Sequence, residues 1–411
     1  MTFDDFNFHP SILDALYYMH FDEATPVQEK AIPAIMQGRD LLATAQTGTG
    51  KTASFVLPIL NNLAINPSEK INTLIIVPTR ELALQIEQAI QGFSYYINAS
   101  SIAVYGGGDG IDFNLQRNAL RNGVNIVVAT PGKMISHLNQ GYVDASALQF
   151  LILDEADRML DMGFYDDIQK IISFLPEKRQ NLMFSATMPT QIMKLVKQTL
   201  KNHIEIKIAV SKPAEGVSLT AYHVFDTQKI PLAKDIIQNN SHFTSILIFT
   251  STKKNVLDLV RALKNNKYTV AGISSDFDQK ERENVLLGFK SGNIKVLVAT
   301  DVLSRGIDIA NIDMVINYDV PSDAEDYVHR VGRTARAASK GEAVTFVNKD
   351  DAYKMIRIER LIERKIEVMP LPIILGKGPE FNNNGANSNE NHKNNKGFKR
   401  GNYRKGQGQR R

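Results

Sequence analysis

Short, mostly apolar runs recur along the chain and alternate with longer stretches in which apolar residues follow a helical spacing. Runs of four or five such residues are typical of buried strands, and their alternation with helices predicts a mainly parallel sheet covered on both faces. The runs of the first half occupy residues 40–44, 73–77, 102–105, 125–129, 150–153 and 181–184. The expected fold class is therefore α/β.

A second series of the same kind follows. Its runs occupy residues 245–249, 269–271, 295–299, 314–317 and 343–346. Between the two series the periodicity lapses, and Pro213 and Gly216 appear, which is typical of a linker. We therefore expect one domain over 1–208, a linker over 209–217 and a second α/β domain of similar size over 218–372.

The last part of the chain, residues 373–411, is rich in Asn, Gly, Lys and Arg. From Gly376 to Arg411, five Lys and four Arg stand against two Glu, a net charge of +7 that leaves −3 for the remaining residues. Such a segment buries too little apolar surface to offset its ordering entropy, so we expect a disordered tail. Its basic residues, interspersed with Phe381, Phe398 and Tyr403, favour attachment to single-stranded nucleic acid; a solubilising tail without a partner is the alternative.

Composition narrows the class of protein. The 411 residues carry a formal net charge of +4 and include no cysteine, which excludes disulfides, thiol catalysis and cysteine-bound zinc and favours a reducing cytoplasm. The eight histidines show no metal-binding spacing, and no run reaches the roughly 18 apolar residues of a membrane span. The acidic, aromatic start does not resemble a secretory signal. We expect a cytoplasmic protein without membrane contact.

The functional interpretation depends most on residues 45–52, Ala-Gln-Thr-Gly-Thr-Gly-Lys-Thr. They lie between the first predicted strand and a helical stretch, so backbone N–H groups and the helix N-terminus converge, as in phosphate-binding loops. Lys51 would reach the β- and γ-phosphates of a nucleotide, and the Thr52 hydroxyl would bind Mg²⁺. Ala45 stands where the general pattern has glycine, and a Gly/Thr-rich surface turn is the alternative.

Polar clusters follow two later strands of the same predicted sheet. Residues 154–157, Asp-Glu-Ala-Asp, come directly after one strand. There, beside a phosphate loop, Asp154 would hold Mg²⁺, largely through water, and Glu155 would orient and deprotonate the attacking water. A solvated loop is the alternative for an isolated acidic tetrad. Ser185 and Thr187 end the next strand, and their hydroxyls would either bond the acidic cluster or cap the following helix.

Upstream of the loop, residues 11–19 have the spacing of an amphipathic helix, and Thr25 before Pro26 marks the start of another. Phe21 offers a ring that stacks on a base, and Gln28 offers an amide that pairs with the N6/N7 edge of adenine. Ordinary helix packing is the alternative for both residues, but the phosphate loop downstream favours the nucleotide.

The second predicted domain has no phosphate loop but carries arginines near strand ends. Residues 329–336, His-Arg-Val-Gly-Arg-Thr-Ala-Arg, are the densest such segment. Arginines in a domain without a nucleotide loop suggest arginine fingers that reach the γ-phosphate in the first domain when the two domains close. A solvated basic helix is the alternative.

In this order and spacing, the motifs resemble those of the DEAD-box RNA helicases, and most of all their bacterial RhlE-like subgroup. The tetrad 154–157 is the family's namesake, and the loop with Ala45 matches the family's form of the phosphate-binding motif. The resemblance runs from Phe3 to about Leu371. It implies two tandem RecA-like domains with mainly parallel sheets and with ATP in the cleft between them.

The resemblance also implies roles for individual residues. Nucleotide binding falls to Phe21, Thr25, Gln28, Gln46, Thr47, Gly48, Thr49, Gly50, Lys51, Thr52 and Asp308. The catalytic groups implied are Lys51, Asp154, Glu155, Arg330 and Arg333, and those near Mg²⁺ are Thr52 and Asp154. Residues that couple hydrolysis to strand separation are Asp157, Ser185, Thr187 and His329.

RNA contacts are implied for a further set. Its members are Pro78, Thr79, Arg80, Gly107, Gly108, Thr130, Pro131, Gly132, Lys133, Gln279, Arg282, Thr300, Asp301, Arg305 and Gly306. In the family these positions hold the sugar–phosphate backbone, and contacts to 2′-hydroxyls give the preference for RNA over DNA. Lys133 stands where arginine is usual, which keeps the charge but loses the forked donor.

The sequence thus predicts an ATP-dependent RNA helicase that clamps single-stranded RNA and separates short duplexes locally. The expected cofactors are ATP and Mg²⁺, and the expected partner is RNA, single-stranded or in short duplexes. Ribosomal precursors and RNA-decay proteins are further candidates, and the core is expected to be monomeric. Two alternatives stay open: a DNA-directed helicase of the same superfamily, and an RNA clamp or scaffold whose ATPase acts only as a timer.

Overall fold

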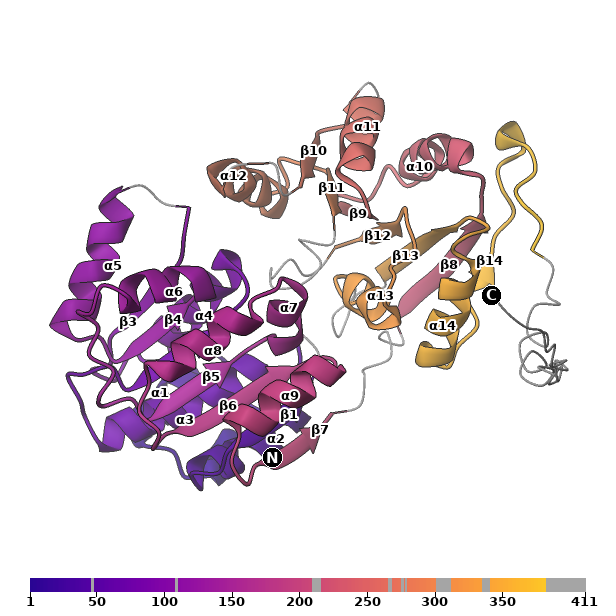
Figure 1. The fold of residues 1–411 in the computed structure, drawn as a ribbon. Helices are drawn as coiled ribbons and strands as arrows, with labels where there is room; N and C mark the ends of the chain where they lie inside the picture. The colour runs from indigo at the N-terminus through magenta and orange to yellow at the C-terminus, as the bar shows by residue number, and fades with distance from the viewer. Residues whose placement is uncertain are drawn as a thin grey trace, which may run out of the picture.

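The computed structural model describes residues 1–45, 48–107, 110–208, 216–264, 268–274, 277, 279–300, 312–334 and 341–381. In these residues the chain forms two α/β units, each built on one twisted sheet (Figure 1). Every strand pair in both sheets is parallel. The predicted α/β class with two mainly parallel sheets is confirmed.

In the described residues the first sheet has seven strands, in the order β3-β4-β2-β5-β6-β1-β7. Their bounds are β1 Leu41–Thr44, β2 Thr73–Ile76, β3 Ser101–Val104, β4 Ile126–Ala129, β5 Phe150–Leu153, β6 Gln180–Ser185 and β7 Ile204–Lys207. Because all strands are parallel, their carboxyl ends meet at one edge of the sheet, where ligands of such folds gather.

Helices cover both faces of this sheet. One face packs against η1 (Phe3–Phe6), α1 (Pro10–Tyr18), α2 (Pro26–Met36), α3 (Lys51–Ile65) and α4 (Arg80–Phe93). The other packs against α5 (Gly110–Asn122), α6 (Pro131–Leu138), α7 (Ala156–Asp161), α8 (Tyr165–Ser173) and α9 (Thr190–Thr199). Successive strand residues point to opposite faces, so Leu41 and Ala43 join the first core and Leu42 the second.

The second sheet repeats the topology of the first. Its described strands are β8 Val217–His223, β9 Ile246–Thr250, β10 Val270–Ile273, β11 Val296–Thr300, β12 Met314–Asn317, β13 Gly341–Val347 and β14 Glu367–Val368. Their order, β10-β11-β9-β12-β13-β8-β14, is that of the first sheet when the strands of each unit are counted from its own first strand. The strands β1 and β8 therefore correspond, as do β5 and β12.

The helices of the second unit also lie on both sides of their sheet. Those on one face are α10 (Asp226–Asn239) and α11 (Lys253–Lys264), with η3 (Ile373–Leu375) beside α10. Those on the other are α12 (Gln279–Lys290), α13 (Ala324–Val331) and α14 (Ala352–Ile362). No helix among the described residues is long and apolar enough to span a bilayer.

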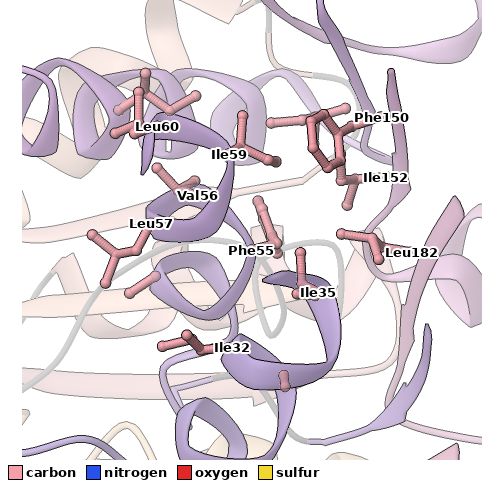
Figure 2. Packing of buried hydrophobic residues seen from close by; sticks show 14 of the residues in the cluster. Ile32, Ile35, Phe55, Val56, Leu57, Ile59, Leu60, Phe150, Ile152 and Leu182 are labelled. Atoms are coloured by element: carbon pink, nitrogen blue, oxygen red, sulfur yellow. The ribbon is translucent and has the colours of Figure 1, made fainter. Parts of the chain in front are cut away.

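The helix that follows the phosphate loop is almost wholly buried. Figure 2 shows its side chains gathered with those of α2 and of the strands: Phe55, Val56, Leu57, Ile59 and Leu60 with Ile32, Ile35, Phe150, Ile152 and Leu182. The Phe55 ring lies 5.2 Å from that of Phe184 in β6. Tight burial of this kind fixes the start of α3, and with it the loop, relative to the sheet.

The structure adds three strands that the apolar runs did not predict: β7, β8 and β14. Val217, the last residue of the predicted linker, is the first residue of β8, and residues 209–215 of that linker lie outside the described residues. Of the predicted tail, residues 373–381 are described, and 382–411 lie outside the described residues.

Candidate functional site

The predicted nucleotide and RNA residues divide along the edge of the first sheet. The phosphate loop and the acidic and hydroxyl clusters follow β1, β5 and β6, which are neighbours in the order β5-β6-β1. The predicted RNA residues of this unit follow β2, β3 and β4, which are neighbours in the order β3-β4-β2. One edge therefore carries two adjoining sets of residues, one per half.

The phosphate loop closes tightly against the start of α2. Gly50 has φ +93°, and a Cβ added there would lie 2.5 Å from Gln28 Nε2, so no other residue fits without a shift. Gln28 Nε2 donates to the Gly50 carbonyl at 3.1 Å, and Gln28 Oε1 accepts from Thr25 N–H at 2.8 Å. Gln46 and Thr47 lie outside the described residues.

Gln28 is therefore already engaged on both sides of its amide and is only 2% exposed. It joins the start of α2 to the phosphate loop, and the second N–H and second lone pair of the amide are the groups left for adenine. Phe21, by contrast, keeps 36% of its surface exposed, with its ring edge-on to Phe93 at 5.3 Å. That ring is available for stacking on a base.

Lys51 and Asp154 face each other across the phosphate loop. The Nζ of Lys51 lies 3.8 Å from Asp154 Oδ1, and both side chains are buried. Burial raises the pKa of Asp154 to about 6, against the opposing effect of Lys51, and Glu155 raises the pKa further. Lys51 therefore offsets only part of the cost of burying the Asp154 carboxylate, so an additional cation would stabilise its charged form.

Glu155 is held in an unusual backbone conformation beside this carboxylate. It has φ 49° and ψ 49° in the left-handed region, and its N–H donates to Asp154 Oδ1 at 2.9 Å. Its own carboxylate is buried and lies 3.5 Å from Arg158 Nη1. For a non-glycine residue this conformation costs of order 1 kcal/mol or more, so the surrounding contacts hold it.

Asp157 joins the acidic cluster to the end of β6. Its Oδ2 accepts bonds from Ala186 N–H, Thr187 N–H and Thr187 Oγ1 at 3.2, 2.9 and 3.0 Å. The Ser185 hydroxyl donates instead to the Thr187 carbonyl at 2.7 Å. Of the two alternatives, the Thr187 hydroxyl bonds the acidic cluster, so Asp157 is joined directly to Ala186 and Thr187.

The predicted RNA residues of the first unit lie at the starts of α4 and α6 and in the loop after β3. Thr79 caps α4 by accepting from Leu82 N–H, and Pro131 is the first residue of α6, which Thr130 precedes. Arg80 packs over the ring of Tyr105, 4.3 Å from its centroid, and pairs at 2.9 Å with Glu283 of α12 in the second unit. An RNA phosphate at Arg80 would replace that carboxylate. Gly108 lies outside the described residues.

In the second unit the predicted catalytic arginines are buried. Arg330 is 0% exposed; its Nη1 donates to Asn317 Oδ1 at 3.2 Å and to the Asp319 carbonyl at 2.8 Å. Arg333 and His329 are buried beside it. Arg330 thus supports the end of β12 through Nη1.

The remaining residues predicted to bind RNA or nucleotide in this unit are only partly described. Thr300 ends β11 and is buried, and Arg282 lies half-buried in α12. The side chain of Gln279 is not described. The other predicted residues lie outside the described residues: Asp301, Arg305, Gly306 and Asp308.

A buried ion pair that sequence reasoning missed lies where Lys51 and Asp154 lie in the first unit. Lys229, in the helix after β8, pairs with Asp319, just beyond β12, at 2.9 Å, and with Asp226 at 3.2 Å. Asp319 Oδ2 also accepts bonds from Thr250 Oγ1 and from Ser251 N–H and Oγ. This closer pair is enclosed by hydrogen bonds, so in the second unit it stabilises the fold around Arg330. An acidic residue just after a strand, as at Asp154, was the available signal.

Asp319→Asn is expected to destabilise the second unit by about 2 kcal/mol near neutral pH. Burial alone would raise the pKa of Asp319, but the Ser251 N–H and Lys229 bring it to about 2, below the ordinary 3.8. Because the pKa of Asp319 is lower in the folded state, its carboxylate stabilises the folded unit above pH 3.8. This contribution to the free energy of unfolding is lost as the pH falls toward 2. In denaturant unfolding, the difference in free energy of unfolding between wild type and variant should therefore narrow as the pH falls from 3.8 toward 2. Asp350→Asn, exposed, is the control; a gap independent of pH would contradict this role.

Comparison with known proteins places these features in a family. The model of the DEAD/DEAH box helicases matches residues 25–195, and that of the helicase conserved C-terminal domain matches residues 228–338. The chain is 39% identical over 374 residues to the DEAD-box ATP-dependent RNA helicase RhpA of Helicobacter pylori, spanning 91% of this chain and 75% of that protein. It is 39% identical over 371 residues to the ATP-dependent RNA helicase CshA of Listeria monocytogenes, spanning 90% and 70%.

Solved structures are similar over both units. S. cerevisiae Dbp5 bound to RNA and ADP BeF3 has a TM-score of 0.80 and 27% identity, covering 90% of this chain and 95% of that chain. Mss116 bound to ssRNA and UDP-BeF has a TM-score of 0.79 and 28% identity, covering 91% and 81%. The expected tandem RecA-like fold is confirmed. The chain belongs to the DEAD-box family of ATP-dependent RNA helicases.

Proposed function

We propose that the chain clamps single-stranded RNA across its two units and separates short RNA duplexes locally, with ATP hydrolysis reopening the clamp. The observation that carries this proposal is the division of the first sheet's edge, together with the matching strand order of the second sheet. In the first unit, nucleotide residues follow β5, β6 and β1, and RNA residues follow β3, β4 and β2; the second unit has the same strand order. Closing two such edges on each other would place ATP and RNA side by side in one cleft.

On this proposal the first unit supplies the hydrolytic groups. Lys51 binds the β- and γ-phosphates, and Glu155, held beside Asp154, accepts the proton of the attacking water. Thr52 and the partly neutralised Asp154 would hold Mg²⁺ largely through water; when bound, the ion neutralises charge on the phosphates. Among the described residues no three acidic, His or Cys side chains gather to bind a metal.

The second unit would complete the site. Arg330 lies at the end of α13 and Arg333 just after it, and closure brings them toward the γ-phosphate. Phosphate release would then reverse closure, and Asp157 would carry the change to Ser185 and Thr187 through the bonds described above. A site shared by two units explains why ATP and RNA binding would depend on each other.

RNA recognition on this proposal is mainly of the backbone. Arg80, Lys133 and the residues at the starts of α4 and α6 offer charge and N–H groups rather than base-reading side chains, so the core should tolerate many sequences. Dbp5 and Mss116, which are similar to this chain over both units and were solved bound to RNA, support RNA as the partner. Ribosome assembly or RNA turnover, in the cytoplasm and with a monomeric core, is the setting we propose.

Strand separation is the test of the proposed function. A short RNA duplex with one labelled strand should come apart on addition of protein and ATP, and the rate should fall sharply when ATP is replaced by a non-hydrolysable analogue under multiple turnover. A protein that hydrolyses ATP with RNA but leaves the duplex paired would favour the alternative of an RNA clamp with a timer.

Removing residues 382–411 should weaken RNA binding and flatten its salt dependence while leaving ATP hydrolysis at saturating RNA intact. The cut belongs after Phe381 because the preceding residues are packed: Gln228 Nε2 donates to the carbonyls of Leu375 and Lys377, and Phe381 stacks edge-on to His223 at 4.0 Å. The measurement is RNA affinity across a salt series. An affinity and salt slope equal to those of the full chain would refute the role of the tail.

A further inference from the structure

Each of two predicted RNA-binding cations of the first unit lies over an aromatic ring. Lys133 Nζ, at the start of α6, is 4.5 Å from the centroid of the Phe113 ring on α5. The guanidinium of Arg80, at the start of α4, is 4.3 Å from the centroid of the Tyr105 ring, just after β3. Both separations are within the range of cation–π attraction.

The Phe113 ring is itself supported by a second ring, that of His137. It stacks on the buried His137 ring, with centroids 4.8 Å apart and planes at 12°. Burial, and to a lesser degree Lys133, lowers the pKa of His137 to about 4, so at neutral pH the ring carries no charge and does not repel the lysine. A neutral imidazole has one donor nitrogen and one acceptor nitrogen.

A chain of hydrogen bonds joins His137, on which Phe113 stacks, to the backbone of Tyr105. The Tyr142 hydroxyl bonds His137 Nδ1, His137 Nε2 bonds Gln116 Oε1 at 3.2 Å, and Gln116 Nε2 donates to the Tyr105 carbonyl at 3.3 Å. One consistent assignment runs in a single direction: Tyr142 donates to Nδ1, and Nε2–H donates to Gln116. The backbone of Tyr105, whose ring lies under Arg80, is thereby connected to His137, which supports the Phe113 ring under Lys133.

We propose that Tyr105 and Phe113 are positioning residues that hold Arg80 and Lys133 as a preorganised pair of cations for phosphates of one RNA strand, with Gln116 and His137 connecting the two rings' supports. The inference rests on the proposed RNA function of this edge and adds residues outside the motifs that predicted it.

The physical reason is conformational entropy. Free Lys and Arg side chains sample many rotamers, and ordering them on a ligand costs binding energy. A ring beneath each cation restricts it before RNA arrives. Lys133, which lacks the forked donor of arginine, depends most on this support because it binds phosphate as a point charge.

The test compares Phe113→Leu, which removes the π face and keeps an apolar side chain, with Phe113→Tyr, which restores a ring. The concentration of single-stranded RNA that gives half-maximal ATP hydrolysis should rise about three- to tenfold in Phe113→Leu and return toward wild type in Phe113→Tyr. Turnover at saturating RNA should hold. Tyr95→Leu, an exposed aromatic of the same unit away from these cations, is the matched control.

A double-mutant cycle separates positioning from general packing. In a Lys133→Ala background, Phe113→Leu should have little further effect, because the cation it positions is gone. Lys133→Ala should also lower the salt slope of RNA binding by about 0.7, whereas Phe113→Leu keeps the charge and the slope. Additive effects of the two substitutions would overturn the proposal.

A second double-mutant cycle, Tyr105→Leu with and without Arg80→Ala, applies the same test to the other ring. It tests the positioning role independently if Phe113→Leu fails to fold. Unchanged RNA half-saturation in both leucine variants, with wild type clearly stimulated by RNA, would refute the positioning role alone. Absence of RNA stimulation in wild type would instead refute the proposed function.

Discussion

The variant Glu155→Gln should hydrolyse ATP about 10²–10⁴-fold more slowly than wild type at saturating RNA, the range that a lost general base removes. Glutamine keeps the size of the side chain but cannot accept the proton of the attacking water. Asp154 and Lys51 stay in place, so the variant should still bind ATP and close on RNA. Steady-state hydrolysis and ATP-dependent RNA binding, measured on the same preparation, check both halves of this expectation.

Glu177→Gln is the matched control, because Glu177 is exposed on the same unit and is assigned no role. Its hydrolysis should equal that of wild type. Normal turnover in Glu155→Gln would remove Glu155 from the mechanism. Loss of ATP-dependent RNA binding in that variant would show that the carboxylate is needed for closure as well as for chemistry.

Arg330→Ala should destabilise the second unit by about 3–5 kcal/mol, as expected when buried acceptors lose a charged donor and a large buried side chain is truncated. The guanidinium is fully buried, bonds Asn317 and the Asp319 carbonyl, and lies 5.1 Å from the Phe249 ring centroid. Truncation leaves the two acceptors without this donor and opens a cavity. Denaturant unfolding, followed by a probe in the second unit, measures the loss.

Arg357→Ala provides the comparison, since Arg357 is exposed on α14 and should change stability by less than about 0.5 kcal/mol. An Arg330→Ala variant as stable as wild type but unable to hydrolyse ATP would mean that the arginine acts at the phosphate alone. An unstable variant is the result that the observed hydrogen bonds predict.

Much of the sheet architecture followed from continuous apolar runs. The predicted run 150–153 has the same bounds as β5. All four residues of this strand are buried, so the apolar run begins and ends with the strand. β8 was missed because it alternates: Val217, Leu219 and Ala221 are buried, and polar residues stand between them. β7, an edge strand, was missed because it alternates too, Ile204 and Ile206 with Glu205 and Lys207, and β14 because it has only two residues.

The parts of the candidate site that could be predicted are the polar residues that directly follow a strand. The bond from Thr187 to Asp157 was one of two alternatives, and only the fold decides between them. The engagement of Gln28 with Gly50 and the burial of Arg330 could not be predicted, because each depends on a partner far along the chain or on the packing of a whole unit. The rings under Arg80 and Lys133 belong to this class too: Phe113 and His137 are 24 residues apart in sequence and meet only across α5 and α6.

The most direct test of the central claim is steady-state ATP hydrolysis measured without nucleic acid, with single-stranded RNA and with DNA of the same sequence. A site completed by two units that close on RNA predicts slow hydrolysis alone, strong stimulation by RNA and little by DNA, because the 2′-hydroxyls distinguish the two. Equal stimulation by DNA would point to a general nucleic-acid motor. Fast hydrolysis without nucleic acid would contradict the clamp, because the two units would then complete the site unaided.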